Sequence, residues 1–98
     1  MKVYLVYEGY GNDWADGYRW TEGETVTGIY TDKTCAFSHL NNWGDAMRKR
    51  YPKVEVEDDE LRSPNFPGLK IHLDNHNEEF FCYIAEMDVR DEPKEFED

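Results

Sequence analysis

Cys35 and His39 are the pair of residues in this chain best suited to covalent chemistry. They stand four residues apart in a segment of helical periodicity, which places both side chains on one side of a helix. A thiol beside an imidazole makes a cysteine nucleophile when the surroundings favour the thiolate. The surroundings here are acidic, and no third residue that would orient the imidazole is visible. We therefore expect Cys35 to be a small residue of the first helical turn, without a catalytic role.

His72 and His76 are the second pair with chemical potential, because histidines four residues apart on a helix can share a zinc ion. They flank a predicted hairpin turn at residues 74–77, however, and no C-x-x-C or H-E-x-x-H motif accompanies them. Glycine-rich nucleotide-binding motifs are absent as well. We expect no metal and no cofactor. The alternative is a small thiol- or metal-dependent enzyme that uses Cys35 and His39, or His72 and His76.

The net charge of the chain indicates which classes of partner it can bind. Of its 98 residues, 22 are acidic and 11 basic, which gives a net charge of −11. A surface this negative disfavours direct binding to nucleic acid or anionic membranes and favours a protein with a basic surface, such as a nucleic-acid-binding enzyme. An acidic cluster either imitates spaced phosphates or only makes the protein soluble. Its members are Glu55, Glu57, Asp58, Asp59 and Glu60.

The segment "YEGYGNDWADGYRW", residues 7–20, combines turn-forming residues with an aromatic side chain every three or four positions. In one interpretation Trp14 folds back over a sheet face that a single helix leaves bare. In the other, Tyr10 and Trp14 form an exposed anchor, since rigid aromatic side chains on loops are typical of protein-binding hot spots. Together with residues 55–60, the expected partner contacts in this segment are Tyr10, Asp13, Trp14 and Asp16.

The hydrophobic pattern predicts four strands and one helix, with Gly28 as a candidate β-bulge. Thr31 is the expected N-cap, Asp32 adds negative charge to the first turn, and Pro52 ends the helix. The helix carries an apolar stripe of Ala36, Leu40, Trp43 and Met47, and ends in the basic residues Arg48, Lys49 and Arg50. The expected strands are residues 2–9, 24–30, 69–73 and 78–89, and the expected helix is residues 33–51.

This order, β-β-α-β-β, predicts an α+β fold with a small antiparallel or mixed sheet of about four strands and one main helix packed on one face. Residues 1–89 form the single domain, and residues 90–98 form a flexible acidic tail. Residues 54–68, rich in acids and proline, are expected to be an exposed excursion. Cys35 and Cys82 are too few for a disulfide framework, and no apolar run reaches ~20 residues. We therefore expect a soluble, cytoplasmic protein.

Two segments resemble a loose group of small proteins from bacteriophages and mobile elements. In that group a strand ends in G-[IV]-[YF]-x-[DS], a capped helix follows, and a late strand reads Y-x-[IV]-x-x-[MV]-x-V. The matching residues here are 28–32, "GIYTD", and 83–89, "YIAEMDV". The resemblance covers about half the chain, brings no catalytic motif, and implies a phage origin. It favours a non-enzymatic inhibitor of a host nucleic-acid-handling or defence protein in the host cytoplasm. A structural or accessory subunit of an oligomer is a further alternative, and the oligomeric state stays open.

Overall fold

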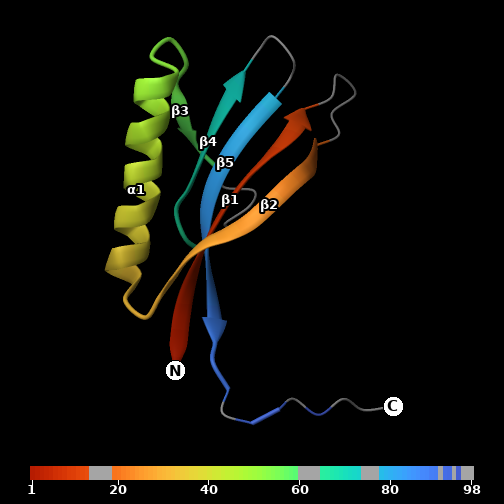
Figure 1. Cartoon of the computed structure of the whole chain (residues 1–98), viewed down its shortest axis with the longest axis vertical. Coiled ribbons are helices and arrows are strands. Elements are labelled where there is room, and N and C mark those ends of the chain that lie inside the picture. Colours follow the sequence, from red (N-terminus) through yellow and green to blue (C-terminus); the bar gives the residue numbers. More distant parts are fainter. Residues whose placement is uncertain (14–18, 60–64, 74–77, 91, 94, 96–98) are drawn as a thin grey trace.

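The computed structural model describes residues 1–13, 19–59, 65–73, 78–90, 92, 93 and 95, with the backbone alone at residues 12, 13 and 19–22. Within these residues, the strands form one antiparallel sheet in the order β2-β1-β5-β4-β3, and α1 lies along one face of it (Figure 1). The bounds are β1 (Lys2–Asp13), β2 (Arg19–Tyr30), α1 (Lys33–Arg50), β3 (Val56–Asp58), β4 (Gly68–Leu73) and β5 (Glu78–Asp88).

The expected α+β architecture with one helix is confirmed, but the expected number of about four strands is wrong. The fifth strand, β3, lies within residues 54–68, which we expected to be an exposed excursion. Val56 stands opposite Ile71, and Asp58 stands opposite Leu69. Strand β3 has three residues, two of them acidic, so its own β-propensity is low. Pairing with β4, which the sequence of the segment does not reveal, sets its conformation.

The hairpin of β1 and β2 extends well into residues 8–22, which we expected to be an aromatic loop. Its pairs continue as far as Asp13 opposite Arg19, past two register shifts. Strand β1 also pairs with β5 from Lys2 to Asn12, so hydrogen bonds hold it on both sides. The first and last strands are therefore both central in the described sheet. Glycine and asparagine are tolerated inside β1 because neighbouring strands, and not local propensity, fix its extended backbone.

Helix α1 is capped one residue later than expected. Asp32, not Thr31, is the N-cap, and its carboxylate accepts a hydrogen bond of 2.8 Å from the backbone N–H of Thr34. A carboxylate satisfies that N–H as well as a hydroxyl does and also complements the helix dipole. The helix ends at Arg50, one residue earlier than expected, with Tyr51 as the C-cap just before Pro52. Among the described residues, no helix has the length and apolar character needed to cross a membrane.

The core lies between α1 and the sheet. On the helix, the predicted stripe is buried at Ala36, Leu40 and Trp43, while Met47 is partly buried. Each fully buried aliphatic side chain contributes roughly 1.5–3 kcal/mol to stability, so this contact supplies most of the force that holds the helix in place. The sheet residues that meet the helix in this cluster are Val6, Ile71, Cys82 and Ile84.

The sheet face turned away from α1 is apolar as well. Phe81 is fully buried there, and Tyr7 stacks on Tyr83 with ring centroids 5.0 Å apart. Near the other end of the same face, Ile29 is 66% exposed and Met87 51% exposed. This second face is thus closed to solvent around Phe81 and open around Ile29.

Two isoleucines on opposite faces test this arrangement. Ile71 is fully buried against α1, so Ile71→Ala should lower the free energy of unfolding by about 2–5 kcal/mol. The same truncation at Ile29 removes a mostly exposed side chain and should cost less than about 1 kcal/mol. Urea denaturation followed by tryptophan fluorescence measures both values. Equal losses for the two variants would contradict the assignment of the faces.

Candidate functional site

An open groove runs beside α1, on the side where the helix passes over β1 and β2. Its volume is about 530 Å³. Side chains from three elements line it, among them Glu8 of β1, Tyr30 of β2, and Cys35 and His39 of α1. Trp43 and Met47 add apolar surface. In this groove, polar side chains from distant parts of the sequence meet around a cavity.

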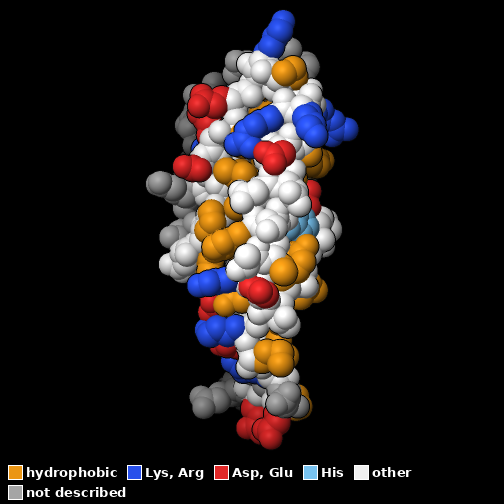
Figure 2. Space-filling model, turned by 90° about the vertical axis from the view of Figure 1, so that its left-hand side faces the viewer, with side chains coloured by type: hydrophobic (Ala, Val, Ile, Leu, Met, Phe, Trp, Pro, Cys, Tyr) orange, Lys and Arg blue, Asp and Glu red, His pale blue; other side chains and the backbone are white. Residues whose placement is uncertain are grey.

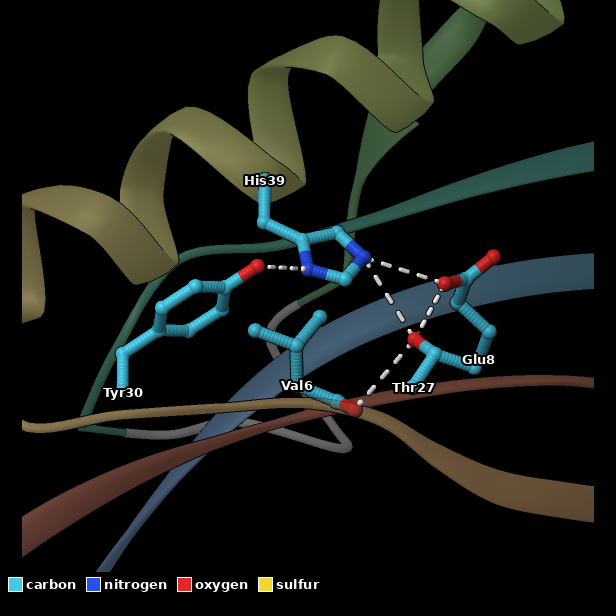
Figure 3. A network of polar contacts seen from close by, with 5 residues as sticks. All are labelled: Val6, Glu8, Thr27, Tyr30 and His39. Carbon is cyan, nitrogen blue, oxygen red and sulfur yellow. Dashed lines mark hydrogen bonds and ion pairs between the residues drawn. The ribbon is translucent and has the colours of Figure 1, made fainter.

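His39 is the centre of a polar network in this groove (Figure 3). Tyr30 and the ring Nδ1 are joined by a hydrogen bond of 2.8 Å, and the ring Nε2 lies 3.1 Å from Oε2 of Glu8. Thr27 hydrogen-bonds the same carboxylate oxygen and lies 3.5 Å from the carbonyl oxygen of Val6. A neutral ring satisfies every contact: the Tyr30 hydroxyl donates to Nδ1, and Nε2–H donates to Glu8. Side chains of α1, β1 and β2 are thereby tied together.

Gly28 makes the close approach of His39 possible. A Cβ atom at this position would lie 2.6 Å from Nδ1 of His39 and 2.6 Å from the ring of Tyr30, closer than real Cβ contacts come. The register also shifts here, since Val6 pairs with Gly28 while the next residue of β1 pairs with Val26. The extra residue of this bulge is Thr27, next to Gly28, where the sequence predicted the bulge. The bulge brings the hydroxyl of Thr27 to the side of the sheet that faces the helix.

Sequence reasoning found His39 but missed Glu8, Thr27 and Tyr30. A signal for Glu8 was available: Tyr4, Val6 and Glu8 alternate on one face of a strand, so a carboxylate follows two core positions. A carboxylate on an inward-facing row needs a partner. The identity of that partner depends on how the helix crosses the sheet, and periodicity does not contain that information.

Cys35 and His39 line the same groove, as their spacing predicts, but they do not form a catalytic pair in this arrangement. Among the described contacts, no hydrogen bond joins the thiol to the ring, and both ring nitrogens already bond other residues. Cys35 is exposed, whereas Cys82 is buried opposite Glu8 on the helix-facing side of the sheet. Burial, reinforced by the negative charge of Glu8, raises the pKa of the Cys82 thiol to about 12. Cys82 is therefore a protonated core residue.

The predicted histidine pair is only partly described. His72 lies on β4 directly opposite Glu79 of β5, and His76 lies outside the described residues. Within the described part of the chain, no three His, Cys, Asp or Glu side chains form a group that could hold a metal ion.

The predicted acidic cluster divides into exposed and buried members. Glu55, Glu57 and Asp58 are exposed, with the last two on the edge strand β3. Asp59 is 1% exposed, so its assignment as a surface contact is wrong. Its backbone N–H donates a hydrogen bond of 2.8 Å to the carbonyl oxygen of Gly68, which carries β3–β4 pairing one residue further. Glu60 lies outside the described residues.

Of the two residues of the predicted aromatic anchor, Tyr10 and Trp14, the structure describes Tyr10. Tyr10 is 44% exposed on the helix-facing side of β1, with its ring 6.5 Å from that of Phe80. The backbone of Asp13 belongs to β1, and its side chain is not described. Trp14 and Asp16 lie outside the described residues, so their roles stay predictions.

The helix face is not uniformly negative. Figure 2, which looks onto α1, shows both basic and acidic side chains, with Lys and Arg side chains near the end where the helix stops. Arg48 pairs with Asp45 at 3.0 Å, and no ion pair within the described residues joins the last helical turn to the exposed acids of residues 55–58. The side chains of Glu55, Glu57 and Asp58 are exposed to solvent.

No protein-family model matches the chain, and neither a curated protein nor a solved structure matches it.

The raised pKa of Cys82 makes stability depend on pH. Between the ordinary thiol pKa of 9.0 and about 12, the unfolded chain loses the thiol proton while the folded chain keeps it. The free energy of unfolding should therefore fall as pH rises through this window, by at most about 1.4 kcal/mol per pH unit from this group. Cys82→Ala should flatten the slope, measured by urea denaturation between about pH 9 and pH 11. The control Cys35→Ala should keep it, and equal slopes for Cys82→Ala and the parent chain would refute the assignment.

Proposed function

We propose that this chain is a non-enzymatic, acidic protein-binding protein that occupies the basic surface of a partner which normally binds nucleic acid. The observation that carries the proposal is the set of exposed carboxylates at the edge strand β3 of a chain with a net charge of −11. Such a surface attracts basic proteins and repels nucleic acid and anionic lipids. The protein acts by competition and neither makes nor breaks a bond.

Strand β3 presents its charges at an edge of the sheet. An extended strand advances about 3.3 Å per residue and turns successive side chains to opposite faces, so neighbouring carboxylates on it point in opposite directions. Glu57 and Asp58 lie on this strand, and Glu55 comes just before it. Strand β3 is at the edge of the described sheet, next to β4 alone. A basic surface that wraps around this edge would therefore meet Glu57 on one face of the strand and Asp58 on the other.

The aromatic part of the contact lies on the other side of α1. Tyr10 is on β1, three inter-strand spacings from β3, or about 14 Å. A partner that covers the usual ~800 Å² of one protein surface spans this distance. We propose that Tyr10 anchors the rim of the contact, together with Asp13, Trp14 and Asp16 of the adjacent segment and with Glu60 beyond β3.

A phage-type inhibitor of a host nucleic-acid-handling or defence protein, working in the host cytoplasm, is the most specific form of the proposal. The resemblance of residues 28–32 and 83–89 to small phage proteins supports this origin. The hydrogen bonds of His39 support binding over thiol catalysis, because both ring nitrogens are engaged within the fold.

A charge-neutralised variant tests the proposal. The triple change Glu55→Gln, Glu57→Gln and Asp58→Asn should weaken partner capture at least about 10-fold, since each contact charge contributes roughly 0.2–1 kcal/mol or more. The measurement is capture of proteins from a bacterial lysate on the immobilised chain, with identification by mass spectrometry. Capture by the parent chain should fall at high salt, and duplex DNA should displace the captured protein.

The matched control removes three charges elsewhere: Asp88→Asn, Glu92→Gln and Glu95→Gln, all at exposed positions of the last strand and the tail. It should keep capture within about 2-fold. If both triple variants bind the captured protein as the parent does, the carboxylates of residues 55–58 do not form the contact and the proposal fails.

A further inference from the structure

We infer that the groove beside α1 takes an arginine side chain of the protein partner, and that Glu8 receives its guanidinium. The inference rests on the proposed function and goes beyond it, because it assigns a second, specific contact on the other side of α1 from β3. Three properties of the groove support it: a carboxylate oxygen that the fold leaves available, aromatic and apolar walls, and a lining without positive charge.

The carboxylate of Glu8 is held by one oxygen. Thr27 and His39 both contact Oε2, and no described contact involves Oε1, which points away from both residues (Figure 3). The side chain of Glu8 is 32% exposed, so the group is half-buried and still open to the groove. A half-buried carboxylate with an oxygen available favours a cationic donor.

The walls of the groove suit a guanidinium better than an ammonium. Tyr30 and Trp43 supply aromatic surface, and Met47 adds an apolar side chain. A guanidinium is planar, weakly hydrated and able to stack on aromatic rings, while its methylene stem packs on apolar surface. A lysine ammonium keeps more of its hydration and gains less from such walls. The volume of about 530 Å³ lies within the range of known ligand pockets and admits a long side chain.

The charge around the groove points to the same ligand. No lysine or arginine is among the described residues that line it, although the last turn of the same helix is basic. The net charge of −11 draws a basic partner toward the molecule, and the groove offers one of its side chains a defined position. An arginine in this position would fix the orientation of the partner, which the more diffuse attraction of β3 does not do.

N-acetyl-arginine amide is the probe that tests the groove without a partner protein. Titrated into the nitrogen-15-labelled chain, it should give saturable shifts at the amides of Tyr30, Cys35 and His39, with a Kd on the order of 1–10 mM. N-acetyl-citrulline amide has the same shape without the charge and should give none. Equal shifts from the two probes, or arginine shifts confined to the amides of residues 55–58, would overturn the inference.

Two neighbouring asparagines of α1 give a matched pair of variants. Both are exposed, but Asn42 lines the groove and Asn41 does not. Asn42→Arg places a positive charge at the groove and should weaken the binding of the probe at least about 5-fold, while Asn41→Arg adds the same charge outside it and should leave the Kd unchanged. Glu8→Gln keeps an oxygen for His39 and Thr27 and should also abolish saturable shifts. Equal probe binding by the two arginine variants would refute the site.

Partner capture separates this inference from the proposed function. Asn42→Arg should reduce capture of the partner, whereas Asn41→Arg should not. If Asn42→Arg captures the partner normally while the triple variant of residues 55–58 does not, the groove is not part of the contact and the proposed function stands. If the triple variant captures normally, the proposed function fails, and the titration with the arginine probe still decides whether the groove binds a guanidinium.

Discussion

The hydrogen bonds of His39 are the constraint on which the rest of this structure depends. Apolar packing presses α1 onto the sheet but is non-directional, so it tolerates small shifts of the helix. The bonds to Tyr30 and Glu8 are directional, and leaving a half-buried polar group without them would cost about 1–3 kcal/mol. They fix where the helix crosses the β1–β2 hairpin. Gly28 has no Cβ atom and so leaves room for the His39 ring to approach β2. The groove exists because the helix is held in that position.

This constraint also organises the charge of the molecule. It places the carboxylate of Glu8 in a groove with aromatic walls, while the exposed acids of β3 lie three strands away. Helix α1 lies between the two negative features, and its last turn is basic. A partner that satisfied all three would need a basic surface with a projecting cation and an acidic patch between them. That requirement is more selective than a net charge of −11, since shape and sign must match together.

Local periodicity and capping were enough to predict part of this fold. The helix, its buried stripe and the first and last strands have strong patterns, and all were found. Strand β3 was missed because only its pairing with Ile71 and its neighbours makes it a strand. Asp59 was taken for a surface acid because it stands among four others, whereas the fold buries its side chain. His39 was paired with Cys35 by spacing alone. Its observed partners, Tyr30 and Glu8, depend on how α1 packs across the sheet.

The nitrogen-15 spectrum of the His39 ring, recorded at mildly alkaline pH, tests this central role most directly. We expect a proton on Nε2, none on Nδ1, a pattern unaffected by Cys35→Ala, and a shift of the Nδ1 resonance in Tyr30→Phe. A ring whose resonances change with Cys35→Ala and ignore Tyr30→Phe would show that the imidazole pairs with the thiol. That result would contradict a molecule that works by binding and would favour one that works by covalent chemistry.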